Sequence, residues 1–171
     1  ELHGGAGDDD LRGDEGSDKI TGGEGDDLIH GGSEFIDKDD AADTLDGGAG
    51  NDEMYGNAGD DEMHGGAGDD AIDGGEDADK LNGGGGDDLL NGGKGDDTLR
   101  GQDGDDTLTG GDGADTFQFD DRDFNNNGGA TPLDTVTDFE LGVDTAKFRF
   151  DGRYFGGSNK TSFSTQAEFN A

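Results

Sequence analysis

Residues 47–73 read GGAGNDEMY, GNAGDDEMH and GGAGDDAID, three successive nonapeptides with one layout. The same register runs back to Gly4 and on to Gln118, which gives twelve copies in all. Every copy has Gly at position 1, Asp at position 6 and an apolar residue at position 8. Three columns that stay in phase over twelve copies predict a fold in which one repeat stacks on the next.

The array has one interruption. The copy at residues 31–46 is seven residues longer than the others, with an insertion at 33–43. Its Asp43-Thr44-Leu45 keeps the Asp-x-apolar ending, so we expect its strand to persist behind a bulging loop. Glu1-Leu2-His3 matches the last three positions of a further copy, so we expect the array to belong to a longer chain.

The composition indicates that a hydrophobic core alone is not enough to fold this chain. Only 26% of its 171 residues are hydrophobic and its formal net charge is −34, which is typical of disordered chains. Such a charge repels nucleic acid and attracts multivalent cations. A flexible acidic linker would not place an apolar residue at every ninth position, and collagen would need glycine at every third.

Zinc and membrane insertion are both disfavoured. The chain has no cysteine, and His3, His30 and His64 each end a nonapeptide, so we expect them to be surface residues. No apolar run approaches the roughly 18 residues that a membrane span needs, and no signal peptide is recognisable.

The repeat itself favours calcium. Glycines at positions 1, 2 and 4 permit positive φ and a tight six-residue turn with inward carbonyls, and Asp at position 6 adds a carboxylate. Hard oxygens at this density suit Ca²⁺, whereas Mg²⁺ prefers to keep its waters. Positions 7–9 are then expected to form a short strand with position 8 inward. The candidate carboxylate ligands are Asp9, Asp18, Asp27, Asp43, Asp52, Asp61, Asp70, Asp79, Asp88, Asp97, Asp106 and Asp115.

Residues 4–118 resemble the RTX (repeats-in-toxin) family, whose calcium-binding nonapeptide has the form GGxGxDxUx. The segments GADTFQF (113–119), DTVTDF (134–139) and GVD (142–144) also look like the end of the repeats in secreted serralysin-type proteins. The resemblance implies an all-β, right-handed parallel β-roll that folds when calcium binds and leaves the cell by type I secretion.

In the family, two nonapeptides make one turn and a calcium ion lies between copy n and copy n+2. The first copy supplies the carbonyls of positions 2 and 4 with its Asp, and the second supplies those of positions 1 and 3 with its Asp. Carried over, the carbonyls of the first kind belong to Gly5, Gly7, Gly23, Gly25, Gly48, Gly50, Asn57, Gly59, Gly66, Gly68, Gly75, Asp77, Gly84, Gly86, Gly93 and Gly95. Those of the second kind belong to Gly22, Glu24, Gly47, Ala49, Gly65, Ala67, Gly74, Glu76, Gly83, Gly85, Gly92, Lys94, Gly101, Asp103, Gly110 and Asp112.

Twelve copies paired in this way predict eight to ten Ca²⁺ ions, with room for one or two more after the repeats. The inward columns are expected to be Leu11, Ile29, Met54, Ile72, Leu90 and Leu108 on one side, and Ile20, Leu45, Met63, Leu81, Leu99 and Phe117 on the other.

Some copies depart from the pattern. Position 2 is Asp14, Asn57 or Gln102 in three copies, which a carbonyl ligand tolerates, whereas Asp77 at position 4 is expected to be mildly strained. Sites that would use Gly32 and Ser33 are doubtful.

Two further acidic stretches leave alternatives open. The acidic loop with Glu34, Asp37, Asp39 and Asp40 is either solvated or binds an additional ion. Residues 121–125 have the opening spacing of an EF-hand loop but lack its later residues. A calcium-binding loop of another shape is the alternative for this stretch.

We divide the chain into an RTX roll at 1–118 and a capping, secretion-associated segment at 119–171. The second segment holds eight of the ten phenylalanines and the only proline, and is expected to be a β-rich cap over the end of the roll. Its expected core is Phe139, Leu141, Val143, Phe148 and Phe150. Residues 156–171 are either disordered or part of an export signal.

The chain has three candidate functions. The first is a secreted, monomeric calcium-dependent folding module of a larger extracellular protein, and the second is a calcium-stiffened part of a surface layer or adhesin. The third, an enzyme, is disfavoured because the chain has no Gly-x-Ser-x-Gly, no His-Glu-x-x-His and no Cys, and its carboxylate pairs recur in every copy as ligands would.

Overall fold

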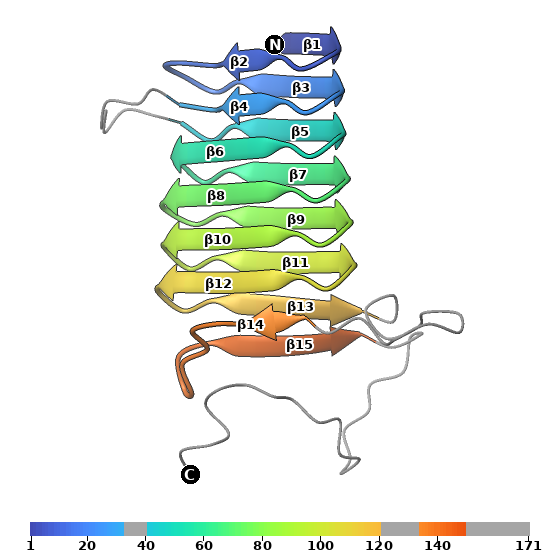
Figure 1. Ribbon diagram of the computed structural model, residues 1–171. Coiled ribbons are helices and arrows are strands. Elements are labelled where there is room, and N and C mark those ends of the chain that lie inside the picture. The colour runs from blue at the N-terminus through green and yellow to red at the C-terminus, as the bar shows by residue number, and fades with distance from the viewer. Residues whose placement is uncertain (33–40, 121–133, 150–171) are drawn as a thin grey trace, which may run out of the picture.

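The computed structural model describes residues 1–32, 41–120 and 134–149. Within these ranges every regular element is a strand, and the chain winds into a parallel β-solenoid of about six turns (Figure 1). Successive strands alternate between two facing sheets, as the resemblance to the RTX family implies. None of the described residues forms a helix that is long and apolar enough to cross a membrane.

The odd-numbered strands form one sheet in sequence order. They are β1 (Leu2–Ala6), β3 (Lys19–Glu24), β5 (Thr44–Ala49), β7 (Glu62–Ala67), β9 (Lys80–Gly85), β11 (Thr98–Asp103), β13 (Thr116–Asp120) and β15 (Thr145–Arg149). The even-numbered strands form the other. They are β2 (Asp10–Arg12), β4 (Leu28–His30), β6 (Glu53–Ala58), β8 (Ala71–Glu76), β10 (Leu89–Lys94), β12 (Thr107–Asp112) and β14 (Thr135–Val136).

The register places each repeat position on the same position one turn later. Met54 pairs with Ile72 and Leu90 with Leu108, so two nonapeptides make one turn. The insertion does not disturb this alignment, because Ile20 pairs with Leu45 across it. The expectation that the strand of the long copy persists is therefore confirmed, while the inserted residues 33–40 lie outside the described part.

The strands are longer than the expected three residues. Most run from position 7 to position 3 of the next copy, as β6 does, because positions 1–3 also pair from turn to turn; Gly93, for example, pairs with Gly111. The expected six-residue turn is therefore wrong, and only positions 4–6 lie between strands, such as residues 59–61. Strands β2 and β4 have only three residues each; they lead into the copy at 13–21 and the lengthened copy at 31–46.

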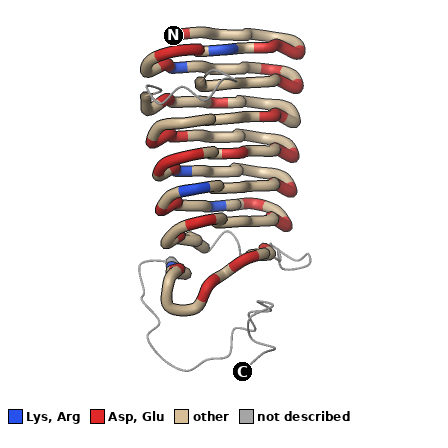
Figure 2. Tube along the Cα trace, turned by 90° about the vertical axis from the view of Figure 1, so that its left-hand side faces the viewer, with Lys and Arg blue, Asp and Glu red and all other residues tan. Residues whose placement is uncertain are grey.

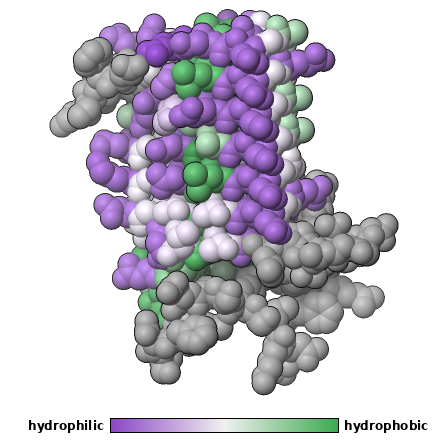
Figure 3. Space-filling model, in the orientation of Figure 1, coloured by the Kyte–Doolittle hydropathy of each residue, from purple (hydrophilic) through white to green (hydrophobic). Residues whose placement is uncertain are grey.

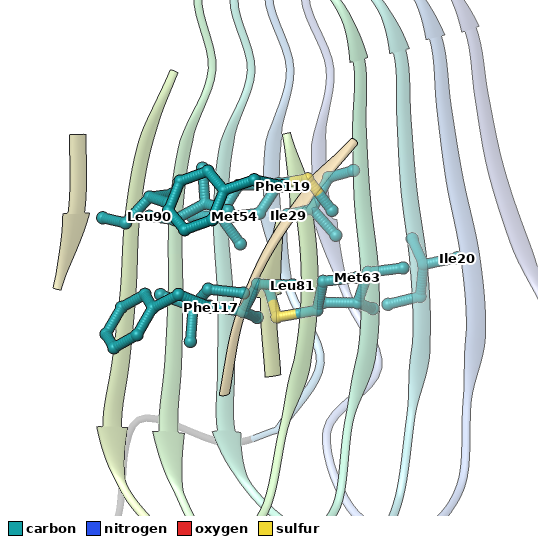
Figure 4. Packing of buried hydrophobic residues seen from close by; sticks show 12 residues of the cluster. Ile20, Ile29, Met54, Met63, Leu81, Leu90, Phe117 and Phe119 are labelled. Atoms are coloured by element: carbon teal, nitrogen blue, oxygen red, sulfur yellow. The ribbon is translucent and has the colours of Figure 1, made fainter. Parts of the chain in front are cut away.

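The core is a thin double column between the sheets. It consists of Ile20, Ile29, Leu45, Met54, Met63, Ile72, Leu81, Leu90, Leu99, Leu108, Phe117 and Phe119. Figure 4 shows labelled members of the cluster, and all but Phe119 occupy the position-8 columns predicted from the sequence. Leu11, at the first turn, is only partly buried. The outer face seen in Figure 3 is mostly hydrophilic.

After the repeats, β14 and β15 extend both sheets by one strand each. Thr135 pairs with Thr107 and Thr145 with Thr116, so the described part of the expected cap continues the solenoid. Phe139 packs against the core, with its ring 5.9 Å from that of Phe117.

Two expected core residues of this segment are exposed. Leu141 is 76% exposed and Val143 41% exposed, because they flank a turn at Gly142 rather than lie in a strand. The expectation that they are buried is wrong. Phe150, residues 156–171 and the side chain of Phe148 lie outside what the structure describes.

Candidate metal sites

The position-6 aspartates are buried between the turns. Ten of them are at most 3% exposed, namely Asp27, Asp43, Asp52, Asp61, Asp70, Asp79, Asp88, Asp97, Asp106 and Asp115. Asp9 and Asp18 belong to the first turn and are half-buried. Figure 2 shows the acidic residues gathered at the turns along both edges of the solenoid, where these carboxylates lie.

One oxygen of each buried carboxylate links two turns. The Oδ1 atom of Asp70 accepts the backbone N–H of Asp52 at 2.8 Å, and that of Asp88 accepts the N–H of Asp70 at 2.9 Å. The same bond, at 2.7–3.0 Å, joins the Asp9, Asp18, Asp27, Asp43, Asp61, Asp79, Asp88 and Asp97 N–H groups to the position-6 Asp one turn later. Position 6 therefore fixes the stacking of the turns as well as carrying charge.

The other carboxylate oxygen has no protein partner among the described residues in most copies. This holds for Oδ2 of Asp9, Asp27, Asp52, Asp70, Asp79, Asp88, Asp97 and Asp106. A buried anionic oxygen without a hydrogen bond or a counter-ion is strongly unfavourable. A row of such atoms therefore indicates a row of cation sites.

Main-chain carbonyls converge on the same oxygens. A Cβ placed on Gly47 would stand 2.3 Å from Asp52 Oδ2 and 2.6 Å from the Gly65 carbonyl oxygen, one turn later. Gly65 repeats the arrangement with Asp70 Oδ2 at 2.3 Å and the Gly83 carbonyl at 2.7 Å. The position-6 carboxylate thus shares a pocket with the position-1 carbonyl of copy n+2, and only glycine at position 1 leaves room for it.

The structure brings the expected ligand set together only in part. For the site expected from Gly48, Gly50, Asp52, Gly65, Ala67 and Asp70, the Asp52 carboxylate lies beside the Gly65 carbonyl and Asp70 lies against the Asp52 backbone. The Ala67 carbonyl already accepts the Gly50 N–H at 2.9 Å. A carbonyl oxygen has a second lone pair, so this bond still allows Ala67 to be a ligand.

Positions 2 and 4 of the regular copies adopt positive φ, as the glycine pattern predicts, whereas the position-1 glycines do not. The four copies without glycine at one of these positions keep that geometry, with φ of 68° at Asp14, 79° at Asn57, 76° at Asp77 and 83° at Gln102. Asp and Asn are found at positive φ more often than most residues, whereas Gln at position 102 has no such preference. The strain expected at Asp77 is present, and the repeat geometry continues through it.

Position 5 has a role that the sequence reasoning missed. The Oδ1 atom of Asp8 accepts the backbone N–H of Asp26, and that of Asp69 accepts the N–H of Asp87, one turn later in each case. This second ladder runs in the opposite direction to that of position 6 and is exposed. The recurrence of Asp or Asn at position 5, in eight of the eleven regular copies, was the signal that could have revealed it.

Burial raises the pKa of the central position-6 aspartates. The pKa of Asp79 is raised to about 8, that of Asp88 to about 7 and those of Asp70 and Asp97 to about 6, mainly by desolvation and further by neighbouring carboxylates. Burial likewise raises the pKa of Asp52, Asp106 and Asp115. A cation in the gap would offset this and keep the carboxylates ionised.

Side chains alone do not form a metal site in the described residues. No group of three or more His, Cys, Asp or Glu that could hold a metal is found there, so any site must use main-chain carbonyls. Carbonyls and paired carboxylates are hard oxygen donors, which fit calcium. His3 is exposed, and His30 and His64 are half-buried, with the His30 ring stacked on Tyr55. The acidic loop 34–40 and residues 121–125 lie outside the described part.

The comparison with known proteins agrees with this geometry. Five stretches match the family model of the RTX calcium-binding nonapeptide repeat, at residues 3–34, 39–72, 55–90, 64–99 and 82–117. No curated protein matches the chain. Because the family matches cover more than half of the sequence, the chain belongs to the RTX calcium-binding nonapeptide repeat family.

Proposed function

We propose that this calcium-binding module is disordered without calcium, folds into the solenoid when calcium binds after type I secretion, and supports the folding of a larger extracellular protein. The observation that carries the proposal is the row of buried carboxylate oxygens that have no protein partner in the part of the chain the structure describes. The solenoid buries them between turns, so its folding depends on a cation that neutralises them. The module has no catalytic role in this proposal.

The thin core supports the same conclusion. Each turn after the first buries two position-8 side chains, while the ordering of the backbone opposes folding at every residue. The formal charge of −34 adds repulsion in the compact state. Ten divalent ions would carry +20 and leave −14, which is tolerable for a folded domain.

We assign the ions to the gaps between copy n and copy n+2. Each gap would use the two position-6 carboxylates that face it, the position-1 carbonyl beside them, and the carbonyls of positions 2, 3 and 4 expected from the family. Eight to ten ions follow from this pairing, depending on the sites that involve the lengthened copy. The shared carboxylates couple neighbouring sites, so the calcium transition is expected to be steep.

The proposed working range is that of extracellular calcium sites, about 10⁻⁴–10⁻³ M. Cytosolic calcium would then leave the chain unfolded and able to pass through a secretion channel, and the outside medium would fold it. Binding to the folded state alone converts the free energy of calcium binding into free energy of folding.

A calcium titration followed by far-UV circular dichroism tests this proposal. We expect a disordered spectrum in chelator and a steep rise of β signal near millimolar calcium, with Mg²⁺ at the same concentration as the control. A β signal already present in chelator at neutral pH, or folding complete at micromolar calcium, would leave only a static calcium-binding scaffold. That outcome would favour the second candidate function, a stiffening module of a surface layer or adhesin.

A further inference from the structure

Two aspartates beyond the twelve copies occupy the place that position 6 has in the repeats. Thr135 N–H bonds the Asp106 carbonyl at 2.7 Å and Thr145 N–H bonds the Asp115 carbonyl at 2.7 Å. Within the repeats, Thr116 N–H bonds the Asp97 carbonyl in the same way, also at 2.7 Å. The preceding residues, Asp134 and Asp144, therefore stand where a repeat would have its position-6 Asp.

Their side chains also continue the position-6 ladder. Asp134 Oδ1 accepts the backbone N–H of Asp106 at 3.3 Å, and Asp144 Oδ1 accepts that of Asp115 at 3.1 Å. The strand register agrees, because Leu108 pairs with Val136 and Phe117 with Ala146, both in position-8 columns. Residues 134–137 and 144–147 are thus the ends of two degenerate copies that the glycine pattern does not reveal.

The carboxylates of Asp106 and Asp144 differ in their hydrogen bonds. Asp106 is 1% exposed, and its Oδ2 has no hydrogen-bond partner among the described residues, like the carboxylates inside the array. Asp144 has both oxygens engaged by backbone N–H groups, because its Oδ2 accepts the Glu140 N–H at 2.7 Å. The gap between Asp106 and Asp134 therefore repeats the state of the interior gaps.

We propose that Asp134 completes one further Ca²⁺ site with Asp106, after the last gap formed by the twelve copies. This inference rests on the proposed function, since it uses the same ligand scheme. The carbonyls of Gln102 and Gly104, at positions 2 and 4 of the copy that contains Asp106, would complete the first half of the site. Asp144 joins the turns through its hydrogen bonds with the Asp115 and Glu140 N–H groups.

The site would matter because it lies where the solenoid passes from regular repeats to the final strands. An ion there neutralises the buried Asp106 carboxylate and holds Asp134 at the start of β14, which itself has only two residues. Calcium would thereby order the last turn together with the roll.

Counting bound ions tests the proposal. Calcium bound at saturation would be measured by equilibrium dialysis and atomic emission for the whole chain, for Asp134→Asn and for the control Asp96→Asn. The Asp134→Asn variant keeps an oxygen that can accept the Asp106 N–H but loses the charge. We expect one ion fewer in Asp134→Asn alone, while Asp96→Asn makes the same charge change at an exposed side chain and keeps an oxygen for the Ala114 N–H.

The outcomes separate this inference from the proposed function. An unchanged ion count in Asp134→Asn, or an equal loss in Asp96→Asn, overturns the assignment of Asp134. Absence of calcium binding by the unaltered chain would instead overturn the proposed function. If Asp134→Asn does not fold, as judged by circular dichroism, a calcium-saturated crystal of the unaltered chain decides: a cation between the Asp106 and Asp134 carboxylates supports the assignment, and only water there overturns it.

Discussion

The Asp70 Oδ1 atom accepts a hydrogen bond of 2.8 Å from the backbone N–H of Asp52, one turn earlier. Its Oδ2 faces the opposite way, beside the Gly83 carbonyl of the next turn. One carboxylate therefore contacts two successive gaps between turns. A chain of such shared carboxylates would make ion binding in one gap depend on the next.

Asp70→Asn tests this sharing. The substitution keeps an oxygen for the Asp52 N–H and removes the charge, so we expect calcium affinity to fall about tenfold in two gaps, ~1.4 kcal/mol for each. Isothermal titration calorimetry would measure the loss. The control is Asp69→Asn at the exposed position 5, where Asn51 already occupies the equivalent place in another copy. Equal losses in the two variants would show that position 6 is not the ligand column.

Gly83→Ala tests whether a side chain larger than glycine fits at position 1. The new methyl group would stand 2.1 Å from Asp88 Oδ2, so we expect a loss of about 1–3 kcal/mol in folding free energy at saturating calcium. Gly85→Ala is the matched control, because its nearest atom would be 4.0 Å away and alanine already fills position 3 in four copies. Urea unfolding with calcium present measures both. The crowding argument fails if Gly83→Ala is as stable as Gly85→Ala.

The sequence predicted the repeating part of the fold because each constraint there recurs twelve times. The columns of Gly, Asp and apolar residues determine the turn length, the register and the core, and the structure agrees at Met54, Ile72 and Leu90. The length of the strands was not predictable from alternation, since positions 1–3 lack a hydrophobic pattern yet pair through the backbone.

The segment after the repeats was harder to predict because its constraints occur only once. Phe139, Leu141 and Val143 were expected to be core residues of a β-rich cap, but hydrogen bonds from the Val143 and Asp144 N–H groups to the Glu140 carbonyl close a turn there. This turn leaves Leu141 and Val143 exposed. Asp134 and Asp144 were not recognised as position-6 residues because no glycine pattern precedes them.

Removing the final strands should weaken calcium-induced folding. A chain that ends at Gln118 loses β14, β15 and the Phe139 ring beside Phe117, and leaves the Gly110 and Gly111 N–H groups without the Asp138 carboxylate. We expect its calcium midpoint to rise severalfold relative to a chain that ends at Arg149, which keeps both strands. Circular dichroism during calcium titration compares the two. Identical midpoints and steepness would show that the final strands do not help the roll to fold.

Acid should act in opposite directions on the metal-free and the calcium-bound protein. The folded-state pKa of Asp79 is about 8 and that of Asp88 about 7, both above the usual 3.8. A raised folded-state pKa means that the folded state binds protons more tightly than the unfolded state. The contribution of these groups to stability is therefore fully present below the unfolded pKa and is lost as the pH rises through about 6 to 8.

Metal-free protein should accordingly gain β structure as the pH falls from 8 towards 4, because protons replace the missing cations on the buried carboxylates. In calcium, protons compete with the ion for the same oxygens, so the calcium midpoint should rise over the same acidification. Circular dichroism of protein freed of calcium by dialysis, and calcium titrations at pH 8 and 6, measure the two effects. Asp79→Asn is the informative variant, since it removes the group whose pKa is raised most and should therefore reduce the pH dependence of the metal-free protein. A metal-free chain that stays equally disordered from pH 8 to pH 4 would show that neutralising these carboxylates is not what calcium contributes to folding.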